Sequence, residues 1–414
     1  MAAENGGRAG YRDRVTERVV IVGAGMAGVQ TAVELRGQGW RGDITLLGDE
    51  PHPPYDRPPL SKAVLLGAGD APVDVRFDVD FGALGVDLRL GSRAQTLHAE
   101  RRELDTDTGT VRYDHLVLAT GAYATELPGT AGLPDVYPLR TLDDAATLRP
   151  VLAAGRDLVV VGAGWIGAEF ATAARQAGCA VTVVEAADRP LAGVLPASVT
   201  AHMRHWYEEA GVDLRTGTAV AAVEPGAVVL ADGSRLVAAA VVVGIGARPS
   251  TGWLGGSAVA LDATGAVLAD DRLRATADEV FAVGDCASFP SGRYGERLLV
   301  HHWDNAVQGP RTAAANLLGG DEPYDPVPYF WSEQFGRFVQ YAGHHVAADT
   351  MLLRGDPASP SWAAVWLRDG LLVAVLAVGR PRDMAQARKL LPRTVAVDPA
   401  LVADPAVPLK SAVR

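Results

Sequence analysis

Short apolar runs, most of them followed by a glycine-rich turn, recur along the chain and predict buried β-strands. Two of these runs open closely similar units, "ERVVIVGAGMAGVQTAVELRGQG" (17–39) and "RDLVVVGAGWIGAEFATAARQAG" (156–178). Each unit passes from an apolar strand through a GxGxxG turn into an alanine-rich helix that ends at glycine, and a second apolar strand follows. The pattern predicts the βαβ unit twice, and therefore an α/β fold built on parallel sheets.

The glycines of each GxGxxG turn have separate requirements. In the first unit, Gly23 permits a tight turn, Gly25 lets the backbone approach a pyrophosphate, and Gly28 lets helix and strand pack closely. The helix N-terminus adds N–H donors for the anion. The corresponding residues of the second unit are Gly162, Gly164 and Gly167. A single GxGxxG turn could be a structural turn that binds no ligand. Two copies, each within a complete βαβ unit, indicate two dinucleotide sites.

An acidic residue follows the second strand of each unit, Asp49 or Glu50 in the first and Glu185 in the second. A carboxylate at this place accepts hydrogen bonds from ribose hydroxyls and repels a 2′-phosphate. Glu185 therefore predicts NADH rather than NADPH, although Arg189 nearby leaves the phosphate alternative open. Two adenine dinucleotides in one chain suggest a flavoprotein, in which one site holds FAD permanently and the other binds NAD(P)H transiently.

Two further apolar strands end at residues suited to ligand contact. "YDHLVLATGA" (113–122) ends at Thr120-Gly121, and "TADEVFAVGDCAS" (276–288) ends at Gly284-Asp285. Gly284 lets the chain turn beneath a ligand, and Asp285 can accept a hydrogen bond from a ribityl or ribose hydroxyl. Either end could be a simple turn, but beside two dinucleotide units the ligand role is favoured.

Composition narrows the class of protein. A length of 414 residues favours two or three domains, and a net charge of −11 argues against a nucleic-acid partner. Cys179 and Cys286 form no CxxC pair and no metal cluster, which fits a reducing cytoplasm. The N-terminus has no apolar signal region, and the longest apolar run (236–247) is too short for a bilayer. We expect a soluble, cytoplasmic monomer or weak dimer, without membrane or metal, and a flexible tail over residues 1 to about 14.

With these pieces assembled, the chain resembles the two-dinucleotide-binding flavoproteins, and within them the FAD-dependent NADH:ferredoxin reductase family that serves oxygenases. The resemblance runs from about Arg18 to the C-terminus. "RPPLSK" and "FWSEQ" are its most specific marks, because they belong to the subfamily rather than to the superfamily. The other matching segments are "VVIVGAGMAGV", "GDEPHPPYDRPPLSK", "LVLATGA", "VVVGAGWIGAEFA", "GIGARP", "VFAVGDCA", "WDNA" and "YFWSEQFG".

The resemblance implies a glutathione-reductase-like architecture. Its parts would be a split FAD domain (14–124 and 253–322), an inserted NADH domain (125–252) and a C-terminal α+β interface domain (323–414). The chain would enter and leave the NADH domain through "GAYATELPG" and "GIGARPS". In the interface domain, "FVQYAGHH" and "SWAAVWLRDGLLVAVLAVG" predict strands, the latter around an Asp-Gly turn.

The segment "DRPPLSK" (56–62) is unusual on physical grounds. Prolines suit the first turn of a helix, but the helix dipole disfavours a lysine there. The resemblance implies that Lys62 lies beside flavin N5 and pairs with Glu169, which would orient it and contact the nicotinamide. Ile166 would lie against the nicotinamide. The alternative is a surface Lys62 in an ordinary ion pair, with Glu169 merely solvated.

The resemblance implies further cofactor contacts. Asp49 would bind the FAD ribose, Asp285 the ribityl chain, and Arg140 would lie along the cofactor. Trp303 and the following helix start would lie against the isoalloxazine, with Trp331 near its opposite face, although such tryptophans often serve only packing. The other residues expected to contact FAD or NADH are Ala27, Arg57, Ala94, Ala119, Thr120, Gly121, Trp165, Gly246 and His302.

The chain departs from the family pattern around the predicted flavin site. His301 and His302 replace the usual Glu-Ser, and they could titrate near neutral pH. A metal pair is disfavoured, because adjacent histidines in a strand point apart. The strand end continues as "YATELPG", without the usual basic stretch. Gly309-Pro310 lies inside an expected helix and predicts a kink or a late start.

The activity implied is that of an NADH:ferredoxin oxidoreductase. Hydride would pass from NADH to flavin N5, followed by two single-electron transfers to a [2Fe–2S] ferredoxin that feeds an oxygenase such as a cytochrome monooxygenase. An acidic ferredoxin needs a basic docking patch, with Arg57, Arg311 and Arg337 as candidates. The alternatives are a flavin oxidoreductase acting directly on a small molecule near His301 and His302, and an apoptosis-inducing-factor-like NADH sensor.

Overall fold

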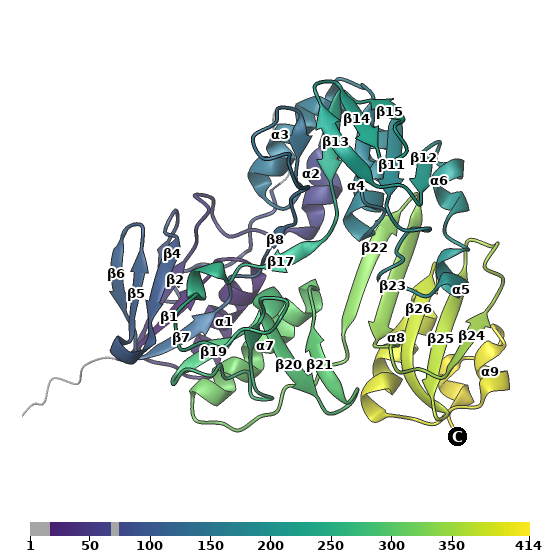
Figure 1. Ribbon diagram of the computed structural model, residues 1–414. Helices are drawn as coiled ribbons and strands as arrows, with labels where there is room; N and C mark the ends of the chain where they lie inside the picture. The colour runs from purple at the N-terminus through teal and green to yellow at the C-terminus, as the bar shows by residue number, and fades with distance from the viewer. Residues whose placement is uncertain (1–16, 68–73) are drawn as a thin grey trace, which may run out of the picture.

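The computed structural model describes residues 17–67 and 74–414, so the expected tail at the N-terminus lies outside the described residues. Three sheets organise the chain (Figure 1). Two of them are parallel and five-stranded, and the third is antiparallel and lies near the C-terminus. The predicted fold class, two Rossmann-like units plus a C-terminal α+β unit, is confirmed.

The first parallel sheet has the strand order β19-β7-β1-β2-β3. Its strands read as continuous apolar runs because helices and other strands cover both faces. Helix α1 (Met26–Gly37) connects β1 to β2, and α7 (Trp303–Leu317) packs along α1. The strands are β1 (Arg18–Val22), β2 (Asp43–Leu47), β3 (Val86–Arg89), β7 (His115–Leu118) and β19 (Val280–Ala282). The sheet therefore joins residues from before 120 with residues from after 279.

The second parallel sheet has the order β12-β11-β10-β16-β9 and lies wholly within the intervening chain. Helix α4 (Trp165–Gln176) connects β10 to β11, and α3 (Leu142–Ala153) precedes β10. The strands are β9 (Val136–Tyr137), β10 (Leu158–Val161), β11 (Val181–Glu185), β12 (Asp213–Thr216) and β16 (Ala240–Val243). A small antiparallel sheet of β13 (Val220–Glu224), β14 (Ala227–Leu230) and β15 (Arg235–Val237) packs against it.

The chain crosses twice between the two parallel sheets, and the crossings pair with each other. Strand β8 (Ala122–Ala124) runs antiparallel to β17 (Ala247–Pro249). These strands fall within the "GAYATELPG" and "GIGARPS" segments. The first sheet also carries two small accessory sheets. They consist of β4 (Ala94–His98), β5 (Glu103–Thr106) and β6 (Gly109–Arg112), and of β18 (Val267–Leu268), β20 (Ala287–Ser291) and β21 (Glu296–Leu299).

The C-terminal sheet is antiparallel, with the order β22-β23-β26-β25-β24. Asp369 (φ 53°) and Gly370 (φ 76°) form the tight turn between β25 and β26, so the predicted Asp-Gly hairpin is confirmed. Helices α8 (Pro381–Leu390) and α9 (Pro399–Ala403) cover one face, and α5 (Ala197–Thr200) and α6 (His205–Glu209) pack on the other. The strands are β22 (Tyr329–Gln334), β23 (Arg337–Gly343), β24 (Thr350–Arg354), β25 (Trp362–Arg368) and β26 (Leu371–Val378).

Helix α7 differs from the expectation for its Gly309-Pro310 pair. The helix begins at Trp303 and continues through Pro310 to Leu317, so the predicted late start is wrong. Proline costs the helix one backbone hydrogen bond. Ala313 and Ala314 are buried in the core that α7 shares with α1, and this packing holds the helix together. Among residues 17–67 and 74–414, no helix combines the length and apolarity that a membrane crossing requires.

Candidate functional site

One cavity of about 620 Å³ runs along the carboxyl ends of both parallel sheets and reaches β22. It follows the turns after β1, β2, β7 and β19 in the first sheet, and those after β10 and β16 in the second. Ligands of open α/β sheets bind at such carboxyl ends. The predicted residues that line the cavity are Gly23, Gly25, Ala27, Asp49, Glu50, Arg57, Lys62, Ala119, Thr120, Gly121, Arg140, Gly164, Trp165, Ile166, Glu169, Gly246, Asp285, His302, Trp303 and Trp331.

Six predicted residues do not line this cavity, and four of these are glycines with packing roles. A Cβ on Gly28 would lie 1.8 Å from the Gly23 carbonyl oxygen, and one on Gly167 would lie 2.1 Å from that of Gly162. These contacts explain why helix and strand need glycine there. The six are Gly28, Ala94, Gly162, Gly167, Glu185 and Gly284. Ala94 lies in β4, away from the cavity lining.

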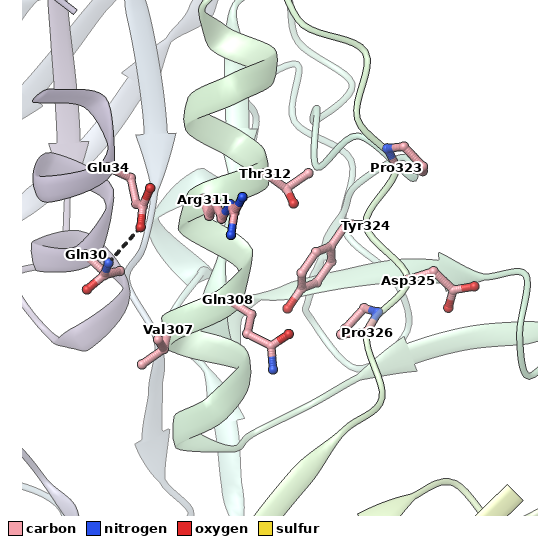
Figure 2. Close-up of a pocket in the computed structure, with 10 residues that line it drawn as sticks. All are labelled: Gln30, Glu34, Val307, Gln308, Arg311, Thr312, Pro323, Tyr324, Asp325 and Pro326. Atoms are coloured by element: carbon pink, nitrogen blue, oxygen red, sulfur yellow. Dashed lines mark hydrogen bonds between the residues drawn. The ribbon is translucent and has the colours of Figure 1, made fainter. Parts of the chain in front are cut away.

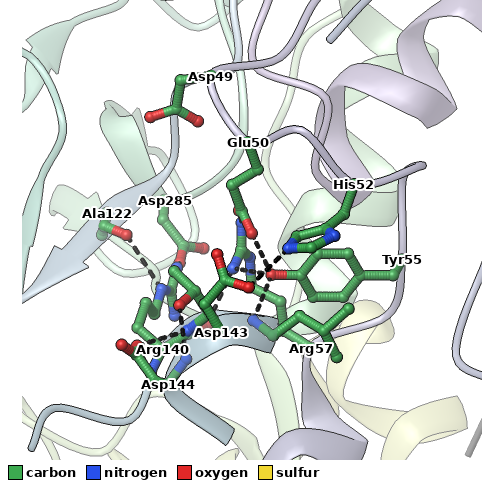
Figure 3. Close-up of polar contacts among 12 residues, drawn as sticks. Asp49, Glu50, His52, Tyr55, Arg57, Ala122, Arg140, Asp143, Asp144 and Asp285 are labelled. Carbon is green, nitrogen blue, oxygen red and sulfur yellow. Dashed lines mark hydrogen bonds and ion pairs between the residues drawn. The ribbon is translucent and has the colours of Figure 1, made fainter. Parts of the chain in front are cut away.

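Tyr55 organises one end of the cavity, a role that the sequence analysis missed (Figure 3). Its hydroxyl donates to Glu50 Oε2 at 2.5 Å and accepts the amide of Leu142 at 2.9 Å. Arg57 Nη2 contacts Glu50 Oε1 at 2.6 Å, and Arg57 Nη1 donates to the Arg140 carbonyl at 2.9 Å. Burial raises the pKa of the Tyr55 hydroxyl, so it stays protonated as the donor to Glu50. The network fixes the Arg57 guanidinium at the cavity wall.

Arg140 is held by the start of α3 and by the end of β19 (Figure 3). Its backbone amide donates to Asp144, which with Thr141 forms the capping box of α3. The guanidinium contacts Asp285 Oδ2 at 3.0 Å and donates to the Ala122 carbonyl at 3.0 Å. The structure therefore brings together Arg140 and Asp285, two predicted residues that lie 145 positions apart.

Lys62 and Glu169 form the ion pair that the resemblance implied, with Nζ and Oε2 2.6 Å apart. Lys62 stands between the 3₁₀ turn η1 (Pro58–Ser61) and the short helix α2 (Ala63–Leu66), not within the first turn of one helix. Lys62 is the N-cap residue of α2, so it still lies at the N-terminal end of a short helix. The Glu169 side chain is 5% exposed, and a carboxylate at such burial requires a partner.

His301 and His302 do not behave as the sequence suggested. They lie in the loop before α7, and the His302 ring packs on Phe330 with ring centres 4.4 Å apart. Burial lowers the pKa of both imidazoles, that of His302 to about 4. The predicted titration near neutral pH is therefore wrong for His302, and burial shifts the pKa of His301 in the same direction. The described residues contain no group of three or more side chains suited to a metal ion.

Two tryptophans stand at the end of the cavity that β22 reaches. Trp303 and Trp331 meet edge to face with ring centres 5.7 Å apart. Trp303 Nε1 donates to Asp56 Oδ1 at 2.9 Å, which fixes the indole at the start of α7. Burial raises the pKa of the Asp56 carboxyl. Asp56 is a second residue that the sequence analysis missed, because only the fold brings it to Trp303.

Glu185 ends β11, as predicted, and its carboxylate is held by backbone amides. Oε2 accepts the amide of Ala163 at 2.8 Å, and Oε1 accepts that of Ala187 at 2.9 Å. Arg189 is engaged elsewhere, since it pairs with Asp188 at 2.7 Å. The end of β11 therefore carries a fixed carboxylate, and the nearby guanidinium of Arg189 is already paired.

Of the three arginines expected on a docking surface, two are committed to internal contacts. Arg57 belongs to the cavity network, and Arg337 pairs with Glu209 while its guanidinium lies 5.0 Å from the Trp206 ring centre. Arg311 is exposed and has no ion pair within the described part of the chain. It lines a second cavity of about 460 Å³ between α1, α7 and residues 323–326 (Figure 2).

The main cavity fits an adenine dinucleotide. A Cβ on Gly25 would have no neighbour within 4 Å, so the glycine turn opens onto free space. Thr120 and His301 line the cavity, and their buried atoms Oγ1 and Nε2 have no hydrogen-bond partner among the described residues. Arg57 and Arg140 also line the cavity, and a guanidinium group can bind a phosphate through two parallel hydrogen bonds.

Comparison with known proteins agrees with this geometry. The profile of the pyridine nucleotide-disulphide oxidoreductases matches residues 17–309, and that of the "Reductase C-terminal" family matches residues 329–413. The chain belongs to the pyridine nucleotide-disulphide oxidoreductase family, whose cofactors here are FAD and NADH. Within that family it is one of the FAD-dependent NADH:ferredoxin reductases.

Three similar proteins support the assignment to the NADH:ferredoxin reductases. Rhodocoxin reductase of Rhodococcus erythropolis is 37% identical, over 95% of this chain and 94% of its own. The ferredoxin–NAD(+) reductase component of the anthranilate 1,2-dioxygenase system of Burkholderia cepacia is 38% identical, over 95% and 98%. The crystal structure of the covalent putidaredoxin reductase–putidaredoxin complex matches with a TM-score of 0.90 and 35% identity, over 95% and 97%.

The family name includes disulphide chemistry, but this chain has no dithiol relay. Its two cysteines, Cys179 and Cys286, are both free and buried. Burial raises the pKa of both thiols, which disfavours the reactive thiolate. The electrons must therefore leave the flavin site by a route without a protein disulphide.

Proposed function

We propose that the protein passes electrons from NADH, through bound FAD, to a small [2Fe–2S] ferredoxin that feeds an oxygenase such as a cytochrome monooxygenase. The observation that carries this proposal is a single cavity that joins both GxGxxG turns, with the Lys62–Glu169 pair between them. The cavity ends at Trp331 on the C-terminal sheet. The named relatives supply the acceptor class, since they include reductases of ferredoxins and of an oxygenase system.

We assign the first GxGxxG turn to FAD. Bound FAD converts between a two-electron donor and one-electron acceptors. Arg57 and Arg140 bind the pyrophosphate, Asp49 the adenosine ribose and Asp285 the ribityl chain. Because Arg57 and Arg140 are already held by Glu50 and Asp285, their guanidinium groups lose little conformational freedom on binding.

We assign the second GxGxxG turn to NADH. Glu185 accepts the ribose hydroxyls and repels a 2′-phosphate. Ile166, whose side chain is 45% exposed at the cavity, forms an apolar platform for the nicotinamide. Lys62 holds a positive charge at the junction of the two sites, where it offsets negative charge that develops on reduction. Glu169 orients that ammonium group.

Stopped-flow mixing of the FAD-loaded protein with NADH, followed by a ferredoxin from the same cell, tests this proposal. We expect rapid bleaching of the flavin band and then reduction of the ferredoxin. Bleaching without electron delivery to any ferredoxin would refute the acceptor and favour direct reaction with a small molecule. A long-lived NADH complex that reoxidises slowly would favour the sensor. Faster bleaching with NADPH than with NADH would contradict the role of Glu185.

We further propose the domain limits 14–124 and 253–322 for FAD, 125–252 for NADH and 323–414 for the interface. The return of β19 to the first sheet and the β8–β17 pairing support them. A cytoplasmic location is part of the same proposal, because two unpaired thiols suit a reducing compartment. Cell fractionation with an antibody tests the location.

A further inference from the structure

The Glu169 carboxylate receives hydrogen bonds from two segments far away in the sequence. Oε2 accepts Ser61 Oγ and Lys62 Nζ, each at 2.6 Å. Oε1 accepts Ser332 Oγ at 2.7 Å and the backbone amide of Glu333 at 3.3 Å. One buried side chain on α4 therefore ties the turn η1 to strand β22.

Strand β22 sets the direction of the Ser332 hydrogen bond. Ser332 and Gln334 lie on the same face of the strand and are each 1% exposed. Gln334 Nε2 donates to Ser332 Oγ at 3.2 Å. Because a hydroxyl has one hydrogen, the hydrogen of Ser332 is left for Glu169. The contacts run in one direction, from the Gln334 amide through the Ser332 hydroxyl to the Glu169 carboxylate.

We propose that Ser332 is a positioning residue for the electron-transfer site. It holds Oε1 of Glu169 so that Oε2 stays directed at Lys62, and so it fixes where the Lys62 ammonium group stands. The terminal torsion of a glutamate is broad, and the lysine side chain is flexible. A carboxylate held at only one oxygen would leave both groups free to move. The proposal rests on the proposed function only in taking bound FAD as the neighbour of Lys62.

The C-terminal sheet thereby supplies part of the site itself. Without the Ser332 hydroxyl, the 3.3 Å contact with the Glu333 amide would be the one hydrogen bond left to Oε1 from the described residues. Glu169 would then turn to seek other donors, and Lys62 would lose its fixed partner. We expect Ser332→Ala to reduce the rate of flavin reduction by NADH at least fivefold, with the KM for NADH within twofold of the wild-type value.

The midpoint potential of the bound flavin gives a readout that lost packing alone would not move. We expect a lower potential in Ser332→Ala, because the ammonium charge that favours the reduced flavin is less well placed. A tenfold decrease in the equilibrium constant for flavin reduction corresponds to a shift of about 30 mV for a two-electron couple. The potential is measured by dithionite titration with reference dyes, so it tests Ser332 even in a protein that delivers no electrons to a ferredoxin.

Thr172 offers a matched control on the same helix. Its hydroxyl accepts the backbone amide of Phe335 at 2.9 Å, and so it also links α4 to the chain just after β22. It forms no hydrogen bond with Glu169 or Lys62. Thr172→Val removes this link and keeps the shape of the side chain, so we expect the potential and the reduction rate of the wild type.

Three results would overturn the proposal. One is a wild-type potential and reduction rate in Ser332→Ala, and another is an equal change in Thr172→Val. Should Ser332→Ala fail to fold, Ser332→Cys keeps the size of the side chain but donates only a weak hydrogen bond. A wild-type potential in folded Ser332→Cys is the third. Failure of the wild type to reduce a ferredoxin would refute the proposed function alone.

Discussion

At the residue scale, Lys62 has one carboxylate partner among the described residues, Glu169, and an open cavity beside it. We predict that Lys62→Ala slows flavin reduction by NADH about tenfold or more, within the usual range for loss of a charge-stabilising donor. FAD should stay bound, because Arg57 and Arg140 are untouched. Stopped-flow bleaching and the FAD content measure both effects. Lys410→Ala, at an exposed site, is the control, and an unchanged rate in Lys62→Ala would make Lys62 a surface lysine.

His302 makes a prediction about pH and stability. Burial lowers its pKa in the folded protein to about 4, below the value near 6.5 of an unfolded chain. The unfolded state therefore binds more protons between these values, and stability falls as the pH falls from about 6.5 towards 4. From pH 7 to pH 5 the free energy of unfolding should drop by about 2 kcal/mol from this group alone. Urea denaturation of the cofactor-free protein measures the drop.

His302→Gln is the matched variant for that measurement. Glutamine does not titrate in this range, so the drop between pH 7 and pH 5 should shrink by about the same 2 kcal/mol. Burial lowers the pKa of His301 in the same direction, so some pH dependence should remain. If the free energy of unfolding drops equally in the wild type and in His302→Gln, groups other than His302 cause the pH dependence.

Single elements also depend on buried ionic contacts, as the C-terminal strand β24 and helices α8 and α9 show. Arg354 on β24 is 1% exposed and contacts Asp383 of α8 at 2.8 Å. It also donates to the carbonyl oxygens of Val402, Asp404 and Val407, at and after α9. One guanidinium thus joins three elements, and Arg380 adds a second ion pair to Asp383.

We predict that Arg354→Met lowers the free energy of unfolding by about 3 kcal/mol, because it leaves a buried carboxylate and three carbonyls without this donor. Thermal denaturation of the C-terminal sheet, followed by the fluorescence of its buried tryptophans, measures the loss. The double variant Arg354→Met/Asp383→Leu should recover part of it. A double variant that is less stable than the single one would show that Asp383 still stabilises the fold through its ion pair with Arg380.

At the scale of the whole molecule, the net charge of −11 would repel the acidic ferredoxin that we expect as the partner. Arg311 is the one docking candidate of the three that stays exposed and without an ion pair in the described residues. We predict that Arg311→Glu raises the KM for ferredoxin severalfold at low salt and that the difference shrinks in high salt. Steady-state ferredoxin reduction at two ionic strengths measures it. Arg235→Glu, on the second sheet's accessory strands, should have no such effect.

The sequence predicted what local pattern controls. Two GxGxxG turns and their strands define both sheets, and resemblance brought Lys62 to Glu169 across 107 positions. The sequence could not predict the hydrogen bond from Ser332 to Glu169, 163 positions away. A single serine forms no motif, and the contact depends on how β22 packs on α4. The sequence analysis also missed the low pKa of His302, since burial is a property of the fold. The late start expected from Pro310 was wrong for the same reason, because packing overrode the local cost.

The position of β19 also bears on how the protein is made. Residues 280–282 complete a sheet whose other strands end by residue 118, so a nascent chain presents β7 as an open edge until about 160 further residues have been made. The inserted sheet needs nothing beyond residue 243 and can close first. While β7 is an unpaired apolar edge strand, it can pair with strands of other chains and so promote aggregation. We therefore expect the first sheet to need protection by molecular chaperones during synthesis, and the second sheet to need less of it.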